Sequence, residues 1–210
     1  MFARRLGPQS IRHWIRRPLW LCLGAILLAS GGANALVDES TGPLLVYAGA
    51  GFRLPIEEAA RLYTERTDLS IEPTFAGSGC LLAQAELAGR GDVFIPGEEH
   101  YLDQARSRGL VGESAPLAWL RPVLAVKRGN PLGVRGLRDL AREDLRVGLG
   151  DPKAVAVGLA AERWLNAELS APEIVRLQAG VRTRALNVNE LGSQLALGAL
   201  DAVIVWDATL

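Results

Sequence analysis

The chain has 210 residues, of which 49% are hydrophobic and 22% charged, with 23 basic and 23 acidic side chains and two cysteines. This balance excludes a disordered tail, a disulfide scaffold and a strongly basic nucleic-acid-binding protein. The charges are unevenly placed, because residues 1–35 hold five arginines and no acidic residue. The remaining 175 residues carry 18 basic and 23 acidic side chains, a formal charge of −5, so the first 35 residues form a separate unit.

Residues 1–35 have the three parts of a secretory signal peptide. Two arginines precede the apolar run 19–29, and small residues follow up to Ala35. The run is shorter than the roughly 20 apolar residues that span a membrane. We therefore predict cleavage after Ala35 and a periplasmic protein with no membrane span after signal removal. Cys80 would then be the only cysteine of the mature chain.

Apolar runs alternate with helical patterns in the first half of the mature chain. Helix 55–66 is expected to turn Ile56, Ala59, Ala60 and Tyr63 inward. The predicted strands and helices, in chain order, are strand 44–48, helix 55–66, strand 69–75, helix 80–89, strand 92–95 and helix 98–109.

The second half continues the same alternation after a break near residues 117–122. The predicted elements are strand 122–126, helix 137–141, strand 145–149, helix 155–169, strands 174–177 and 181–186, helix 189–197 and strand 202–206. This alternation predicts an α/β fold with mostly parallel sheets in two lobes, residues 36–120 and 121–210. Only four residues follow the very apolar strand 202–206, so we expect that a C-terminal part, the return to the first lobe, is missing.

Side chains suited to catalysis are scarce. His100 is the only histidine after residue 35, and neither a Gly-x-Ser-x-Gly elbow nor a phosphate-loop lysine motif occurs. No second histidine or cysteine accompanies His100 to form a metal cluster, so no cofactor is expected. The sequence therefore favours a binding protein over an enzyme.

Small residues recur between a predicted strand and the helix that follows it. These loops are residues 48–51, 76–79, 148–152 and 187–189. Each places backbone N–H donors at a helix N-terminus, where an anion is favoured. If each helix end acts as roughly half a positive charge, four could offset about two negative charges. Because the loops come from both predicted lobes, they predict one shared anion site.

The same loops, with the strands around them, carry a family resemblance. The matching segments are Val46–Gly51, Phe75–Gly79, Gly91–Ile95, Gly150–Pro152 and Asp201–Trp206. Their order and spacing resemble periplasmic molybdate-binding proteins of ABC importers, which have the type II periplasmic binding protein fold. The resemblance implies capture of tetrahedral molybdate or tungstate between two hinged lobes, and delivery to ABC permease and ATPase subunits. We expect a monomer.

In the first lobe, the resemblance implies ligand contacts from two loops. The family's first-loop serine is matched by Gly51, so only the backbone N–H groups of Ala50 and Gly51 remain there. The second-loop serine corresponds to Ser78, or to Gly79 if the register shifts by one. Arg53, just past Gly51, is a further candidate donor, with a surface salt bridge as the alternative.

In the second lobe, the resemblance implies three contacts. The position at the start of the lobe's first long helix is Val157 or its neighbour Ala156, and the valine before the last helix matches Val188. The family's tyrosine corresponds to Trp206, whose indole offers only an N–H donor. Two side-chain donors therefore differ from the family pattern, which leaves the identity of the oxyanion open.

Three alternatives remain at this point. One is a binding protein for another anion, such as sulfate, phosphonate or a small carboxylate. A second is a thiol-dependent enzyme that uses Cys80, which opens a predicted helix beside Ser78, or His100. A third is an inert remnant whose hinge is incomplete.

Overall fold

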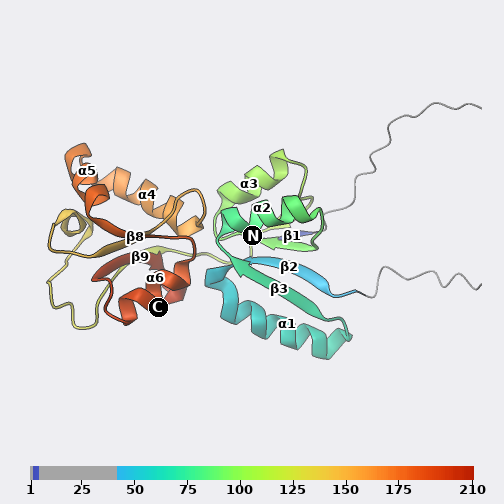
Figure 1. The fold of residues 1–210 in the computed structure, drawn as a ribbon. Coiled ribbons are helices and arrows are strands. Elements are labelled where there is room, and N and C mark those ends of the chain that lie inside the picture. Colours follow the sequence, from blue (N-terminus) through green and yellow to red (C-terminus); the bar gives the residue numbers. More distant parts are fainter. Residues whose placement is uncertain (1, 5–41) are drawn as a thin grey trace, which may run out of the picture.

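The computed structural model describes residues 2–4 and 42–210, which form two α/β lobes side by side (Figure 1). The predicted signal peptide lies outside the described residues, apart from residues 2–4, which form a strand of the first lobe. The predicted cleavage after Ala35 would remove this strand. Each lobe contains one sheet, and four of the seven strand pairings are parallel. The expected α/β fold with mostly parallel sheets in two lobes is therefore confirmed.

The first lobe contains a five-stranded sheet in the order β3-β2-β4-β1-β5. Strand β2 runs parallel to β3 and β4, whereas β1 is antiparallel to β4 and β5. Helix α1 lies on one face of this sheet, and α2 and α3 lie on the other (Figure 1). The elements are β1 (Phe2–Arg4), β2 (Leu44–Gly49), η2 (Ala50–Phe52), α1 (Arg53–Thr67), β3 (Ile71–Ala76), α2 (Ser78–Ala88), β4 (Val93–Ile95), α3 (Glu99–Ser107) and β5 (Ser114–Ala115).

The second lobe contains a four-stranded sheet in the order β6-β9-β7-β8. Strand β7 is parallel to β8 and β9, and β6 pairs antiparallel with β9. Helices α4 and α5 cover one face and α6 the other (Figure 1). The elements are β6 (Pro122–Val126), η3 (Leu137–Ala141), β7 (Val147–Gly150), α4 (Ala156–Glu168), α5 (Ala171–Gly180), β8 (Val181–Ala185), α6 (Val188–Ala196), β9 (Ala202–Trp206) and η4 (Asp207–Thr209).

One predicted strand, residues 174–177, is wrong, because these residues lie in helix α5. Ser170 and Glu173 form a capping box at its start: the backbone N–H and the hydroxyl of Ser170 donate to Glu173 Oε2 at 2.8 and 2.6 Å. Pro172 occupies the first helical turn, where its missing N–H costs nothing. These local signals outweigh the short apolar run.

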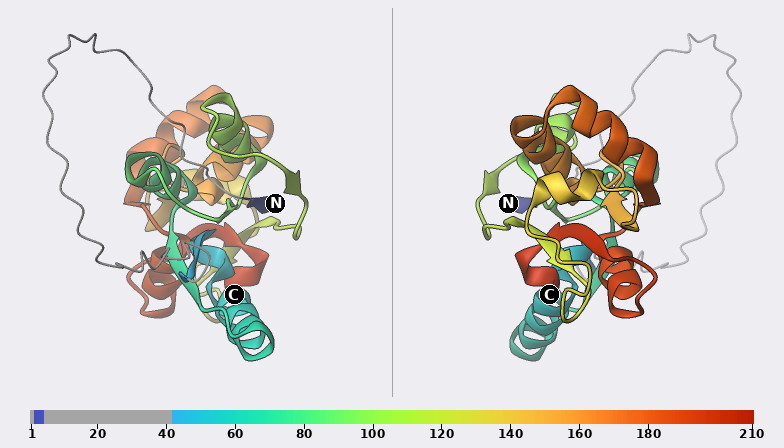
Figure 2. Two further views of the ribbon diagram at one scale, coloured as in Figure 1. Left: turned by 90° about the vertical axis from the view of Figure 1, so that its right-hand side faces the viewer. Right: turned by 90° about the vertical axis from the view of Figure 1, so that its left-hand side faces the viewer.

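The inward face predicted for α1 is partly wrong. Ile56 and Ala60 are half-buried, but Ala59 is exposed and Tyr63 is 40% exposed, and no residue of the helix is fully buried. The helix packs on β3, the edge strand of its sheet, and lies at the margin of the molecule in every view (Figures 1 and 2). Only a narrow stripe of α1 therefore meets other residues.

Most of the buried apolar side chains form one cluster that fills the second lobe and continues across the lobe contact into α2 and α3. All five residues of β9 are buried, in agreement with its apolar sequence. A smaller cluster of Val46, Ala48, Phe52 and Ile95 lies in the first lobe. Among the described helices, none has the length and apolar character needed to cross a membrane.

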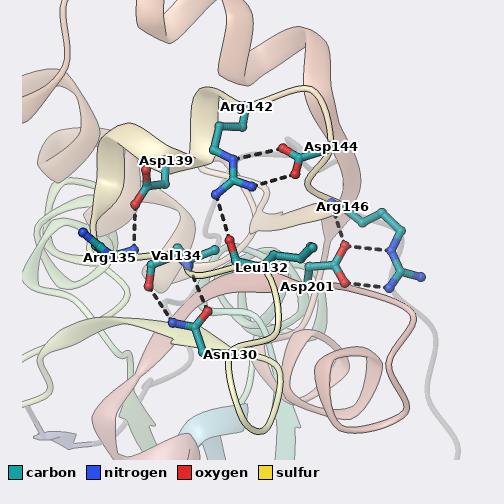
Figure 3. A network of polar contacts seen from close by, with 9 residues as sticks. All are labelled: Asn130, Leu132, Val134, Arg135, Asp139, Arg142, Asp144, Arg146 and Asp201. Atoms are coloured by element: carbon teal, nitrogen blue, oxygen red, sulfur yellow. Dashed lines mark hydrogen bonds and ion pairs between the residues drawn. The ribbon is translucent and has the colours of Figure 1, made fainter.

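A network of polar contacts joins residues of segment 130–146 to one another and to Asp201 in the second lobe (Figure 3). Its centre is the buried carboxylate of Asp201, which accepts from Nε, Nη2 and the backbone N–H of Arg146 at 2.8, 2.6 and 3.0 Å. These bonds join the start of β9 to the start of β7. They hold the two central strands of the sheet in register.

Candidate functional site

A small cleft lies between the two lobes, with a volume of about 10 Å³. That volume accommodates about one water-sized sphere. Four residues of the lining come from the second lobe and eight from the first, and Leu120 belongs to the crossover between them. The lining residues are Gly49, Ala50, Gly51, Phe52, Ala76, Gly77, Ser78, Gly97, Leu120, Val155, Ala156, Val188 and Trp206.

Three helices begin at this cleft, α2 at Ser78, α4 at Ala156 and α6 at Val188, and the short turn η2 begins there at Ala50. The first N–H groups of a helix have no partner within the helix. The residues before η2, α2 and α4 supply no side-chain cap, and the cap of α6 accepts from the N–H of Asn189. Among the first-turn N–H groups, that of Gly79 is taken by the Ala154 carbonyl and that of Gly158 by the Val155 carbonyl. The remaining ones can donate to a ligand, and the positive helix ends favour an anion.

Ser78 provides a side-chain donor in the cleft. The serine is 2% exposed, and its Oγ accepts a hydrogen bond from the N–H of Gly97 at 3.0 Å. A hydroxyl carries one proton to donate, and no group in residues 42–210 accepts it. The Gly97 contact therefore leaves the Ser78 proton available to a bound oxygen atom.

Trp206 provides a second side-chain donor. The residue is 5% exposed, and its Nε1 lies 3.6 Å from the position that a Cβ atom on Gly97 would take. The indole N–H can only donate. The donors of Ser78 and Trp206 therefore flank Gly97 from the two lobes.

The cleft lining contains no charged side chain. Arg53, a predicted ligand contact, lies outside it: its Nη1 donates to Glu57 Oε1 at 3.2 Å, and its Cζ stacks 4.5 Å from the ring centroid of Phe75. The predicted alternative, a surface salt bridge, describes this arrangement. Any anion in the cleft would therefore be bound by neutral dipoles.

Two other predicted residues also lie outside the lining. The N–H of Gly79 donates to the carbonyl of Ala154 at 3.0 Å, across the lobe contact. Val157 is completely buried, with its Cγ1 packed against Gly150 inside the second lobe, and its neighbours Val155 and Ala156 line the cleft instead. The predicted residues that do line it are Ala50, Gly51, Ser78, Val188, Trp206 and Ala156, the alternative given for Val157.

Sequence reasoning missed Gly97. It follows β4, a central parallel strand, on the same edge of the sheet as the loops after β2 and β3. Ligands of open α/β sheets bind outside the carboxyl ends of the strands, so the place of Gly97 just after the predicted strand 92–95 could have indicated it.

The lobes touch directly around the cleft. The Tyr101 hydroxyl donates to the Pro152 carbonyl at 3.1 Å, and Asn189 Nδ2 donates to the Ala50 carbonyl at 3.0 Å. Arg163 pairs with Glu98 across the same contact. Burial raises the pKa of Tyr101 to about 12, so its hydroxyl remains a donor at neutral pH. These contacts describe a closed arrangement of the two lobes.

Two glycines make this close approach possible. A Cβ atom on Gly77 would lie 2.4 Å from the carbonyl oxygen of Ala154, and one on Gly79 would lie 2.4 Å from that of Lys153. Both obstacles are backbone atoms of the second lobe, which cannot swing aside. Any side chain at these positions would therefore hold the lobes apart.

Cys80 and His100 do not form part of the cleft lining. Cys80 is half-buried in the first turn of α2, and His100 is exposed on α3, where its Nε2 lies 2.7 Å from Gln104 Nε2. The described ranges hold no group of three His, Cys, Asp or Glu side chains that could bind a metal ion. The geometry of the cleft suits binding of a small anion.

Sequence comparisons find related binding proteins. A Haemophilus influenzae protein described as a binding protein is 32% identical over 162 residues, which cover 77% of this chain and 65% of that protein. The Escherichia coli molybdate-binding protein ModA is 26% identical over 164 residues, 74% of this chain and 61% of ModA. The chain thus spans less than two thirds of the length of both curated relatives.

Solved structures share the fold. The periplasmic molybdate-binding protein of Azotobacter vinelandii superposes with a TM-score of 0.66 at 21% identity, over 80% of this chain and 72% of that one. A periplasmic thiamin-binding protein gives 0.65 at 16% identity, over 87% and 65%. AfuA from Actinobacillus pleuropneumoniae, with bound fructose-6-phosphate, gives 0.64 at 17% identity, over 79% and 63%. The fold is thus shared by proteins with different ligands.

Residues 44–210 match the family model described as bacterial extracellular solute-binding protein. The family and the fold are those of solute-binding proteins rather than of enzymes. Together with the two-lobed structure and its cleft, this match shows that the chain belongs to the bacterial extracellular solute-binding protein family.

Proposed function

We propose that the protein captures one tetrahedral oxyanion, molybdate or tungstate, in the cleft between its lobes. The observation that carries this proposal is the convergence of helix N-termini from both lobes, with the Ser78 and Trp206 donors, on a cleft lined by uncharged residues. The names of ModA and of the Azotobacter vinelandii protein support molybdate as the ligand class.

The size of the closed cleft supports a compact ion. A volume of about 10 Å³ leaves no space for a thiamin or a sugar phosphate without movement of the lobes. A bare oxyanion is larger than one water molecule and also needs the lobes to move apart, but by less than a thiamin or a sugar phosphate does. Ligand would enter while the lobes are apart, and contacts from both sides would then favour the closed state.

The two side-chain donors of the cleft support a ligand whose oxygen atoms carry no proton. The Ser78 hydroxyl and the Trp206 indole can each donate one hydrogen bond to such a ligand. A protonated oxyanion such as hydrogen phosphate has one oxygen atom that carries hydrogen and accepts less well from these donors, which lowers its affinity. Molybdate, tungstate and sulfate carry no proton at neutral pH.

The proposal includes the cellular setting of the protein. We propose export through the N-terminal signal peptide to the periplasm, with lobes at residues 36–120 and 121–210. The loaded monomer would deliver its ion to ABC permease and ATPase subunits that recognise the closed shape. The chain after residue 35 carries a negative formal charge, so its net charge does not attract an anion. The local dipoles of the cleft would bind the anion instead.

The test is a thermal-shift and calorimetric titration with molybdate, tungstate, sulfate and phosphate. Micromolar binding of molybdate or tungstate should raise the melting temperature, because ligand at 100 times its Kd stabilises the folded state by about 2.7 kcal/mol. Equal melting temperatures with and without all four anions would contradict the proposal. Tighter binding of sulfate would keep the site but change its ligand.

A substitution in the cleft tests the location of the site. Ser78→Ala should weaken binding by about 1–3 kcal/mol, because one donor to a buried anion is lost. Ser107→Ala is the matched control, since Ser107 is exposed on α3 and bonds only to the Gln104 carbonyl at 2.8 Å. Unchanged affinity in Ser78→Ala would place the site elsewhere.

A further inference from the structure

We propose that Gly51 and Trp206 form a matched pair that sets ligand size: the indole fills the space of a side chain at position 51 and restricts the cleft to a bare oxyanion. This inference rests on the proposed function for the class of ligand. Its steric part, the fit between a glycine of one lobe and an indole of the other, can be tested without ligand.

The nearest atoms around the space beside Gly51 are those of the second lobe. A Cβ atom on Gly51 would meet Trp206 Cδ1 at 3.2 Å, Val188 Cγ1 at 3.7 Å and Thr209 Oγ1 at 3.9 Å. All three neighbours belong to the second lobe, although Gly51 lies in η2 of the first. A side chain at position 51 would therefore meet the indole of the second lobe first when the lobes close.

The indole cannot easily move away from Gly51. Trp206 ends the buried strand β9 and pairs with Pro122 of β6. The ring atom bonded to Cδ1, Nε1, lies 3.6 Å from the position that a Cβ atom on Gly97 would take, which is an ordinary contact distance. Both glycines therefore face the same edge of the indole, and the tighter contact is the one at Gly51.

This placement makes Trp206 the main wall of the cleft. It is the largest side chain in a lining that otherwise consists of glycine, alanine, serine, valine, leucine and phenylalanine. A phosphate ester carries further heavy atoms on one oxygen, and these need more room beside the indole than a bare oxyanion needs. Removing the indole is the single change that opens the most space.

A double-mutant cycle with Gly51→Ser and Trp206→Phe tests the pair, with tungstate titrated by calorimetry. Gly51→Ser alone should weaken tungstate binding about tenfold, and in the Trp206→Phe background the same change should cost less than about threefold. Gly136→Ser is the control, because a Cβ atom at Gly136 has no neighbour within 4 Å. Additive effects of the two changes would overturn the pairing.

The effect of the indole on ligand size is measured by the binding of an anion larger than a bare oxyanion. Trp206→Ala should bind L-phospholactate, a small phosphate ester, at least about tenfold more tightly than the unmodified protein does. Trp206→Phe should show a smaller gain in the same direction, and it serves if the alanine variant does not fold. Tight binding of L-phospholactate by the unmodified protein, or no gain in either variant, would overturn the claim.

Small-angle scattering without ligand separates this inference from the proposed function. Gly51→Ser should increase the radius of gyration by holding the lobes apart, Gly77→Ala should do the same, and adding Trp206→Phe should reverse the first increase only. These outcomes do not depend on any anion. An unchanged radius in Gly51→Ser would overturn the pairing even if tungstate binds, whereas an unmodified protein that binds no oxyanion would overturn the proposed function alone.

Discussion

Strand β9 and helix α1 show how differently the two lobes are stabilised. All five residues of β9 are buried at the centre of the second lobe, whereas the 15 residues of α1 in the first lobe include none that is fully buried. Burial of apolar surface contributes about 25 cal/mol per Å². The second lobe therefore holds most of the apolar stabilisation, and the first lobe should open locally at lower cost.

The largest expected effect is a truncation in the core of the second lobe. Ile204→Ala should lower the free energy of unfolding by about 2–5 kcal/mol, because Ile204 in β9 is completely buried and the substitution leaves a cavity. Leu62→Ala in α1 is the matched control, since Leu62 is 36% exposed, and should cost less than about 1 kcal/mol. Urea unfolding followed by circular dichroism measures both, and equal losses would refute the comparison.

The next largest effect concerns the hydrogen bonds between Arg146 and Asp201 in the second lobe (Figure 3). Asp201→Asn should cost about 1–3 kcal/mol of unfolding free energy, because the buried carboxylate accepts three hydrogen bonds from Arg146. The control is Asp144→Asn, whose carboxylate pairs with Arg142 but is exposed, and it should cost less. A loss as large for Asp144 as for Asp201 would show that burial does not decide the difference.

The Asp201 contribution should depend on pH in a defined direction. The guanidinium of Arg146 holds the pKa of Asp201 below its ordinary value of 3.8. Its stabilisation is therefore present above that ordinary value and is lost as the pH falls through the lower, folded-state pKa. The difference in unfolding free energy between the unmodified protein and Asp201→Asn should shrink when the pH is lowered from about 6 to about 3. A constant difference would contradict this assignment.

The smallest expected effect lies in α1. Arg61 bonds to Glu58 at 2.7 Å and to Glu65 at 2.6 Å, but all three side chains are more than half exposed. Exposed ion pairs contribute little, since water and salt screen them. Arg61→Ala should therefore change the urea midpoint hardly at all, and raising the salt concentration should remove any difference. A loss comparable with that of Ile204→Ala would show that these ion pairs stabilise the first lobe.

The sequence predicted the elements that depend on local pattern and missed what depends on tertiary contact. The buried strand 202–206 follows from its apolar run. The helices predicted over 80–89 and 189–197 are present, but they begin two residues and one residue earlier, at Ser78 and Val188. The Ser170 capping box was available in the sequence, and reading it would have corrected the predicted strand at 174–177.

Contacts between the lobes could not be predicted in the same way. Gly79 looks like a free donor in the sequence, but its N–H is taken by Ala154 of the other lobe. Likewise, the orientation of Val157 into its own lobe depends on packing against Gly150. A helix start predicts where donors are, whereas the relative position of two lobes decides which of them face the ligand.

The loop between β7 and α4 has a consequence for the empty protein. Its Pro152 and Ala154 carbonyls accept hydrogen bonds from the first lobe with no ion involved. Each such bond favours closure equally in the vacant and the occupied protein. Since a ligand shifts an equilibrium only by its differential affinity, stronger bonds here would raise the resting population of closed, unloaded molecules. The strength of these two bonds therefore limits how much ligand binding can increase the population of the closed state.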